Sequence, residues 1–215
     1  MSILTIIQSL AKGFLETLQI FGLTVLFSIP LGWIVYFGRV SKNKVLSGLT
    51  KFYISIMRGT PLMLQLLLWY FGPFYLFGAS LKGYKFTAII IGFAVNYAAY
   101  FAEIYRSGMG AIDRGQYEAA EVLGYSKLQT FFRIVLPQVM KIVLPSIGNE
   151  IITLVKDTSL VYCLSYVEMF ALAKQIAAAK TTIMPFIVAG VFYWIFNAVV
   201  AFILNFAEKK LNYYR

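Results

Sequence analysis

Polar and acidic side chains recur at helical spacing inside segments of this sequence that are otherwise apolar. Asn96 and Glu103 are seven residues apart, and so are Glu150 and Asp157, so the members of each pair share one face of a helix. An ionisable group within a membrane span is costly and by default indicates a functional site. These two faces therefore predict a polar solute site between two membrane helices.

Short polar groups near these acids could hydrogen-bond a small solute. Thr158 and Ser159 follow Asp157 directly, and the run Arg58-Gly59-Thr60-Pro61 indicates a break or a helix start, whose free backbone donors would suit a carboxylate. Glu168 adds one more acid, unless it is simply a solvated residue of an outer loop. The predicted substrate-binding residues are Glu103, Glu150, Asp157, Thr158, Ser159, Asn96, Thr60 and Glu168.

Most of these side chains also have a structural interpretation. Glu103 lies three residues from Arg106 and could pair with it, and Asp157 could pair with Lys156 or Arg58. Hydroxyl groups in membrane helices often bond to their own backbone or to a neighbouring helix.

Acids outnumber bases along the predicted path. Glu103, Glu150, Asp157 and Glu168 stand against Lys156, and acidic groups that line a cavity favour a cationic solute. A buried carboxyl group can also be protonated, so the charge balance alone does not fix the solute.

The elements that position these residues are membrane helices. Hydrophobic residues make up 60% of the 215 residues and charged residues only 13%, too few to cover the surface of a soluble domain. Apolar stretches long enough to cross a bilayer predict five spans, at residues 13–38, 52–77, 86–111, 138–160 and 182–207. The predicted fold class is all-α integral membrane, with residues 1–215 as a single transmembrane domain.

Basic residues distinguish the two sides of the membrane. Twelve lie in residues 39–51, in residues 106–141 and in the tail that ends at Arg215, whereas five lie in the alternate connections. Because cytoplasmic loops carry the excess of Lys and Arg, we predict a multi-pass protein of a prokaryotic cell membrane with its N-terminus outside and its C-terminus in the cytoplasm. The first ten residues lack the basic start and the cleavage site of a signal peptide, so we expect them to remain in the mature protein.

One polar segment, residues 113–137, is too long for a simple connector. Its capping signals are Asp113 with Gln116 and Ser126 with Gln129, and its stop signals are Gly124 and Pro137. These signals predict a short helix, a glycine turn and a second short helix on the cytoplasmic face. Such a unit suits the docking of a cytoplasmic partner better than it suits a solvated hairpin.

Several function classes lack the residues that they need. The sequence has no histidine, which excludes imidazole metal ligands and His-based triads. Its one cysteine, Cys163, cannot form an internal disulfide. No G-x-x-x-x-G-K-[ST] run is present, so the chain has no phosphate loop for ATP. The net charge of +10 is explained by membrane topology and not by nucleic-acid binding. We expect no catalytic residue, no metal and no cofactor in this chain.

The polar segment also carries a family signature. Glu118-Ala119-Ala120, then Gly124, then Ile134, Leu136 and Pro137 resemble the EAA loop of the membrane subunits of ATP-binding-cassette (ABC) importers. Three further segments, Arg58–Leu62, Ala102–Arg106 and Lys156–Leu160, are similar to the polar amino-acid permease subfamily. The resemblance covers most of the chain from residue 13 and implies a type I ABC importer-like fold. It assigns ATPase coupling to Glu118, Ala119, Ala120, Gly124, Ile134, Leu136 and Pro137.

The resemblance implies that the chain is the permease subunit of an ATP-driven importer of polar amino acids that works by alternating access. The implied partners are a cytoplasmic ABC ATPase dimer that binds ATP and magnesium, an extracytoplasmic substrate-binding protein, and a second permease copy within membrane lipid, most simply in a homodimer. Combined with the acidic charge balance, it favours arginine, lysine or histidine as the solute, with glutamine or glutamate as the alternative.

Two other classes compete with this interpretation. An ion-gradient-driven transporter or a channel would also carry charges within its spans, but it would not explain the helix–glycine–helix segment. A membrane enzyme would need a nucleophile paired with a base, and Cys163 has no evident partner.

Overall fold

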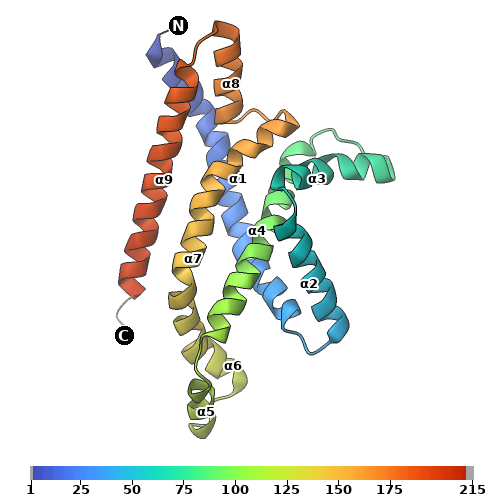
Figure 1. The fold of residues 1–215 in the computed structure, drawn as a ribbon, viewed down its shortest axis with the longest axis vertical. Helices are drawn as coiled ribbons and strands as arrows, with labels where there is room; N and C mark the ends of the chain where they lie inside the picture. Colours follow the sequence, from blue (N-terminus) through green and yellow to red (C-terminus); the bar gives the residue numbers. More distant parts are fainter. Residues whose placement is uncertain (1, 212–215) are drawn as a thin grey trace.

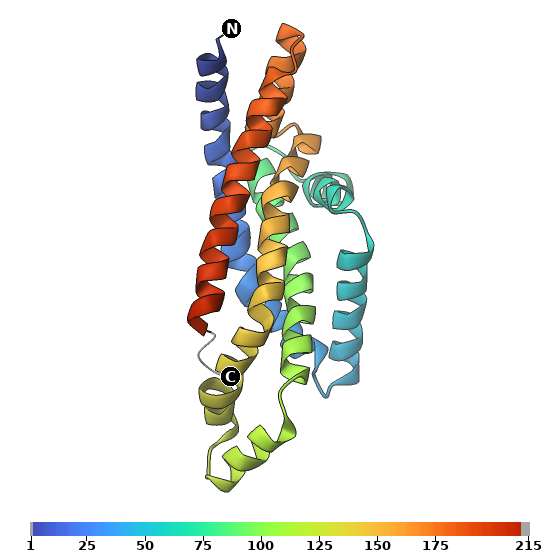
Figure 2. The same ribbon diagram turned by 60° about the vertical axis from the view of Figure 1, so that its left-hand side comes forward.

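The computed structural model describes residues 2–211, and the regular elements in that range are helical, as predicted. In chain order they are α1 (Ile3–Arg39), α2 (Lys44–Gly59), α3 (Leu62–Phe77), α4 (Lys85–Gly110), α5 (Arg114–Val122), α6 (Lys127–Thr130), the π-helical turn η1 (Phe131–Val135), α7 (Leu136–Asp157), the 3₁₀ turn η2 (Thr158–Leu164), α8 (Met169–Lys180) and α9 (Met184–Leu211). The long helices α1, α4, α7 and α9 form a bundle, and α5 and α6 project from one end of it (Figures 1 and 2).

Four of the five predicted spans are confirmed as single helical stretches that are long and apolar enough to cross a membrane. The first begins at Ile3 and not at residue 13. Its 37 residues measure about 55 Å, more than the hydrocarbon thickness of about 30 Å requires. The short helix α8, which the sequence did not predict, lies at the end of the bundle that carries the N-terminus (Figure 1).

The second span, predicted as one stretch over residues 52–77, is wrong as a single helix. Residues 44–59 and 62–77 form α2 and α3, which meet at a bend of 113°. The bend falls where the run Arg58–Pro61 indicated a break. Pro61 explains it, because proline lacks an N–H group and disfavours helical backbone at the preceding residue, and Thr60 is accordingly extended with φ −123° and ψ 151°. As a result α3 lies across the long helices (Figure 2).

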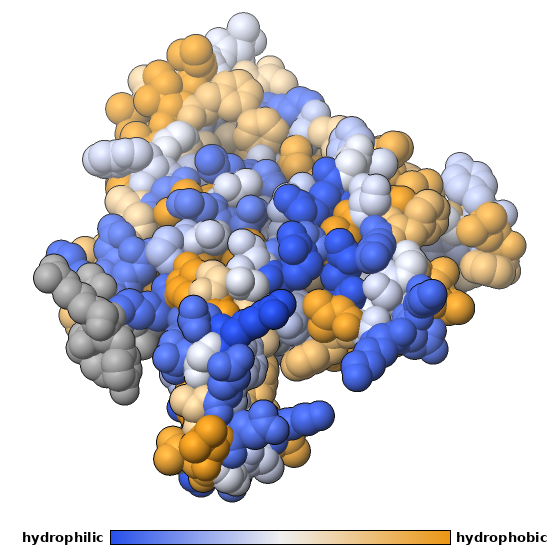
Figure 3. Space-filling model, turned by 60° about the horizontal axis from the view of Figure 1, so that its bottom comes forward, coloured by the Kyte–Doolittle hydropathy of each residue, from blue (hydrophilic) through white to orange (hydrophobic). Residues whose placement is uncertain are grey.

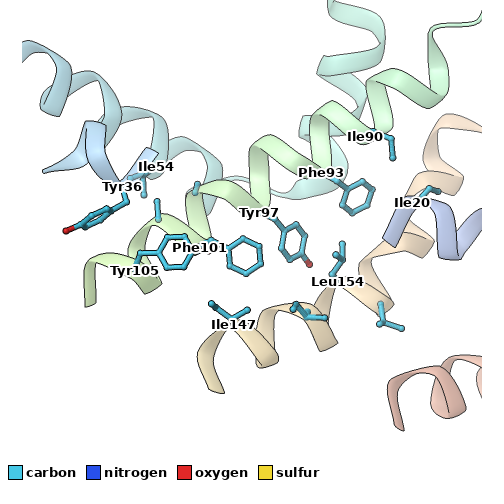
Figure 4. Close-up of a cluster of buried hydrophobic side chains, with 14 of the residues drawn as sticks. Ile20, Tyr36, Ile54, Ile90, Phe93, Tyr97, Phe101, Tyr105, Ile147 and Leu154 are labelled. Atoms are coloured by element: carbon cyan, nitrogen blue, oxygen red, sulfur yellow. The ribbon is translucent and has the colours of Figure 1, made fainter. Parts of the chain in front are cut away.

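Small and aromatic side chains pack the centre of the bundle. Thr17, Thr24 and Ser28 are fully buried on α1, where small side chains allow another helix to approach closely. On α4 the buried aromatic residues follow four-residue spacing, so they line one face: Phe93, Tyr97, Phe101 and Tyr105 (Figure 4). The ring of Tyr105 stacks on Trp33 of α1 at a centroid distance of 4.1 Å. These contacts make α4 the central helix of the fold.

Helices α4 and α7 approach each other closely at Gly108. A Cβ atom at Gly108 would lie 2.2 Å from Cγ1 of Val143, so this crossing requires glycine. The two helices that carry the predicted acids are thus in close contact at Gly108 and Val143.

The polar segment forms the predicted short helix and glycine turn. The Asp113 carboxylate accepts a hydrogen bond from the N–H group of Gly115 at 2.7 Å, and the capping box of Ser126 with Gln129 is complete. Gly124 has φ +75°, a left-handed conformation that ends α5 without the cost of a Cβ atom. The predicted capping role of the Gln116 side chain is not observed, because it accepts a hydrogen bond from Gln138 at 3.2 Å.

The prediction that Pro137 ends this segment is wrong. Helical structure continues without a break from Lys127 to Leu164, through the π-helical turn η1. In that turn the N–H group of Leu136 reaches back five residues to the carbonyl of Phe131. The wider turn accommodates a proline in a continuous helix, because it moves the carbonyl that the ring would otherwise meet. The second short helix is therefore the first part of the fourth span.

The two predicted sets of basic residues lie toward opposite ends of the molecule. The connections after α1 and α4 and the C-terminal end of α9 lie toward the end from which α5 and α6 project (Figure 1). The N-terminus, the connection before α4 and helix α8 lie toward the other end. Arg215, which was counted in the first set, lies outside the described residues.

Candidate functional site

A polar groove runs along α4 and α7 beside the end of α2, and we call it the α4–α7 groove. Its larger part has a volume of about 310 Å³ and its smaller part about 100 Å³, and Tyr100 and Glu150 line both. Other polar residues of the larger part are Arg58, Glu103, Arg106, Ser107 and Ser146. Those of the smaller part are Thr60, Asn96, Tyr97, Thr153 and Asp157. The structure thus brings five predicted site residues together: Thr60, Asn96, Glu103, Glu150 and Asp157.

The acids of α7 lie in this groove without a cationic partner. Among the described residues, no lysine or arginine nitrogen lies within 4 Å of a carboxylate oxygen of Glu150 or Asp157. The Tyr97 hydroxyl donates a hydrogen bond to Oδ2 of Asp157 at 2.8 Å, so the predicted pairing of Asp157 with Lys156 or Arg58 is not observed. The two carboxylates therefore leave negative charge available to a solute.

The groove also contains a cation, at the end of α2. Arg58, in the last turn of α2, places its guanidinium carbon 5.3 Å from the centroid of the Tyr100 ring. Cation–π contact of this kind orients the guanidinium group without consuming its hydrogen-bond donors. Arg58 is exposed and lines the same larger part of the groove as Glu150. A zwitterionic solute could therefore meet both signs of charge.

Glu103 is bound differently from the other two acids. It pairs with Arg106 at 2.8 Å, as the spacing allowed, and also with Arg39 at the end of α1 at 3.3 Å. These contacts join α1 to α4 and compensate the carboxylate. The substrate role predicted for Glu103 stays a prediction, with a structural role observed beside it.

Asn96 and Thr60 lie at the edge of the groove and bond to the protein. The Asn96 amide donates to the Met57 carbonyl at 3.0 Å and to Oε1 of Gln65 at 2.9 Å. The Thr60 hydroxyl accepts from Nε2 of Gln65 at 2.8 Å and donates to the Ile56 carbonyl at 2.8 Å. Gln65, which the sequence did not single out, links the two.

The remaining predicted substrate residues do not line the groove. The hydroxyls of Thr158 and Ser159 donate to the carbonyls of Val155 and Lys156, at 2.7 and 2.8 Å, which is the structural alternative stated for them. The substrate role predicted for Thr158 and Ser159 stays a prediction.

Glu168 is fully buried, so its interpretation as a solvated loop residue is wrong. Its carboxylate caps α8, accepting from the N–H groups of Phe170 and Ala171 at 2.8 Å each. It also accepts from the hydroxyls of Thr17 and Tyr193. Burial raises the pKa of Glu168, and these hydrogen bonds oppose the rise. Glu168 thus joins α1, α8 and α9.

The coupling residues lie on the projecting end of the molecule. Glu118, Ala119, Gly124 and Pro137 are exposed, Ile134 and Leu136 are half-buried, and Ala120 is buried. The same end of the molecule carries four exposed apolar residues that the sequence analysis missed, and we call them the coupling patch. They are Val122, Leu123, Leu128 and Phe132, whose exposed fractions are 88%, 73%, 72% and 60%. Figure 3, with this end forward, shows apolar atoms on the projection beside polar surroundings. Exposed apolar clusters of this kind indicate a protein contact.

Tyr97 and Tyr100 line the groove, and Gln65 bonds to Asn96 and Thr60 beside it, but the sequence analysis assigned none of the three to the site. Aromatic residues are common in membrane helices, so neither tyrosine stood out. The signal that was available is the spacing, because both tyrosines fall between Asn96 and Glu103 on the same helix. Among the described residues, no group of three or more His, Cys, Asp or Glu side chains could hold a metal ion.

Comparison with known proteins gives one consistent family. Residues 28–213 match the family described as "Binding-protein-dependent transport system inner membrane component". The "Putative glutamine transport system permease protein GlnP" of Rickettsia bellii is 37% identical over 204 residues, covering 94% of this chain and 92% of the relative. The "Arginine transport system permease protein ArtQ" of Bacillus subtilis is 34% identical over 207 residues, covering 96% and 94%.

Solved structures agree with this relationship. A crystal structure of an amino acid ABC transporter with histidines has a TM-score of 0.86 at 29% identity, covering 98% of this chain and 99% of that chain. An inward-facing structure of the MetNI methionine ABC transporter has a TM-score of 0.76 at 18% identity, covering 95% and 97%, and this likeness shows the fold alone.

Proposed function

Because the chain belongs to the family of binding-protein-dependent transport system inner membrane components, and is the permease subunit of an ABC importer for amino acids, we propose that its solute is a basic amino acid. ATP hydrolysis belongs to a separate chain of such importers. The solute proposed is arginine, lysine or histidine, bound in the α4–α7 groove during import.

One observation carries the proposal: Glu150 and Asp157 line the groove with no cation within 4 Å among the described residues. Charges that are out of bulk water and unpaired are costly, so a site keeps them where a ligand of opposite sign completes the pair. Glu103 adds little net charge, because two arginines compensate it. The side-chain cation of the solute would then lie between Glu150 and Asp157.

The carboxylate end of the solute would meet Arg58. Its guanidinium group lies over Tyr100 and lines the same part of the groove as Glu150. Planar guanidinium groups bind carboxylates through two hydrogen bonds, which fixes the orientation of the amino acid. Glutamine is the alternative, because the relatives include proteins named for glutamine and for arginine. Its neutral side chain would leave both acids uncompensated.

Binding of radiolabelled arginine and glutamine to the permease–ATPase complex in lipid nanodiscs tests the proposal. The wild type should prefer arginine, and Glu150→Gln and Asp157→Asn should each weaken arginine binding by about 10- to 100-fold, because a hydrogen-bonded charge pair is lost. Glu208→Gln, which removes an acid of α9 outside the groove, serves as the matched control. A wild type that prefers glutamine, or acid variants with unchanged arginine affinity, would sink the basic-solute proposal.

Coupling to ATP would pass through the projecting end. The proposed ATPase contact comprises Glu118, Ala119, the turn at Gly124 and the coupling patch. The helical path from α6 through η1 into α7 is unbroken, so a displacement of the loop reaches Glu150 and Asp157 without crossing a flexible joint. Alternating access then follows if ATP-driven closure of the ATPase subunits rocks α7 against α4.

A second permease copy and the orientation of the chain complete the proposal. The groove is open along one chain, so we propose a homodimer that encloses the pathway between its copies, with an extracytoplasmic binding protein delivering the solute. The basic end that carries α5 and α6 would lie in the cytoplasm, with the N-terminus outside. Cysteines introduced one at a time at Gly115 and at Lys82, in a Cys163→Ser background, and labelled with a membrane-impermeant maleimide test the orientation. Labelling of the Gly115 site in intact cells would contradict it.

A further inference from the structure

The break between α2 and α3 leaves backbone groups without helical partners. The last carbonyls of a helix have no following N–H groups, and within a bilayer each such group must find another partner. Met57 and Thr60 are the residues concerned here, because α2 ends at Gly59 and α3 does not begin until Leu62.

Two buried side-chain amides satisfy these carbonyls. Gln65 of α3 and Asn96 of α4 are 4% and 3% exposed. Nε2 of Gln65 donates to the Met57 carbonyl at 3.0 Å, to the Thr60 carbonyl at 3.2 Å and to the Thr60 hydroxyl at 2.8 Å. Nδ2 of Asn96 donates to the same Met57 carbonyl at 3.0 Å and to Oε1 of Gln65 at 2.9 Å. We call this arrangement the amide clasp.

The amide clasp connects two helices that carry groove residues, α2 and α4. Its anchor on α2, Met57, precedes Arg58, the cation of the groove. Its anchor on α4, Asn96, precedes Tyr97, which bonds Asp157. Both N–H donors of the Asn96 amide are already used within the protein, so the side chain has none left for a solute. The clasp therefore ties the end of α2 that carries Arg58 to the helix that carries Tyr97 and Tyr100.

We infer that Gln65 and Asn96 are positioning residues that hold Arg58 at the edge of the α4–α7 groove and so set the recognition of the carboxylate end of the solute. This inference rests on the proposed function of the groove. Asn96 and Gln65 then act on the solute through the position of Arg58 and not by direct contact.

The test compares arginine with arginine methyl ester, which keeps both positive groups and lacks the carboxylate charge. Both affinities are measured on the permease–ATPase complex in nanodiscs. Gln65→Met, which keeps the size of the side chain and removes its amide, should weaken arginine binding by about tenfold and leave the ester within about twofold. Asn96→Ser, which retains one donor, should give a smaller shift in the same direction. Asn197→Leu, at a half-buried amide of α9 outside the groove, should leave the ratio of the two affinities unchanged.

The outcomes separate this inference from the proposed function. Equal losses for arginine and its ester in Gln65→Met would show that the amide clasp only supports the fold, and would overturn the inference alone. An unchanged ratio in a well-folded Gln65→Met would also overturn it. If the wild type binds neither ligand, the proposed function fails and the inference fails with it.

Discussion

Truncation of the coupling patch should uncouple the permease from its ATPase without unfolding it. The double variant Val122→Ala and Leu123→Ala removes five carbon atoms, each worth about 0.8 kcal/mol when fully buried. In the free chain these side chains are 88% and 73% exposed, so a partner that covers them completely would gain about 3 kcal/mol from the removed atoms. Incomplete coverage halves that gain to about 1.5 kcal/mol, which predicts ATPase binding that is weaker by roughly tenfold.

The assay is binding of the purified ABC ATPase to the permease in nanodiscs, with arginine uptake into proteoliposomes as the functional measurement. Because neither side chain is part of the buried core of the chain, the melting temperature of the isolated permease should stay within a degree or two. The control is Ile203→Ala, an exposed apolar residue of α9 in a predicted span, which should alter neither ATPase binding nor uptake.

Unchanged ATPase affinity in the double variant would refute the assignment of the coupling patch. A loss of affinity that came with a large fall in melting temperature would contradict the reasoning in another way, because it would show that these side chains stabilise the permease itself. Loss of uptake with intact ATPase binding would place their role after docking.

Three further predictions concern stability and charge. Glu103→Gln should lower the melting temperature of the permease, because it removes two partly exposed ion pairs worth less than about 1 kcal/mol each. It should leave arginine affinity within about twofold. A loss of arginine affinity as large as that in Glu150→Gln would instead support a substrate role for Glu103. Gly108→Ala should lower the melting temperature by several degrees, because its Cβ would lie 2.2 Å from a Val143 methyl carbon. Gly110→Ala, where a Cβ would have no neighbouring atom within 4 Å, should leave the melting temperature unchanged. Equal effects of the two substitutions would contradict the close approach of α4 and α7. Burial raises the pKa of Glu168 above its unfolded value, so the folded state binds the proton more tightly. The free energy of unfolding should therefore fall as pH rises from the ordinary glutamate pKa through the raised one. Melting curves across this range should lose that slope in Glu168→Gln, and an unchanged slope would show that another group titrates.

The single-residue signals in the sequence were sound where the physics is local. The capping box at Ser126, the left-handed glycine at Gly124 and the break before Pro61 depend on hydrogen bonds and backbone angles within a few residues. Pro137 was misjudged, because a π-helical turn can absorb a proline and no local pattern showed that one would form.

Side-chain partners were harder to predict, because spacing along one helix says nothing about the next. The pair of Glu103 with Arg106 could be predicted from their spacing, but the second partner, Arg39, comes from a helix 64 residues earlier. For Asp157 the structural alternative was a pair with Lys156 or Arg58, but it accepts a hydrogen bond from Tyr97, 60 residues away. For Glu168 the structural alternative was a solvated loop residue, but it caps a helix that was not predicted.

The membrane setting, most of the spans and the family could be predicted without coordinates, because apolar length, the sign of loop charges and a spaced motif are properties of the chain alone. Which acids are left unpaired depends instead on how the helices pack. Glu103, Glu150 and Asp157 look alike in sequence, and packing brings arginines within 4 Å of the first and of neither of the others among the described residues. The cost of an unpaired charge depends on the atoms around it, and those atoms come from helices that are distant in sequence.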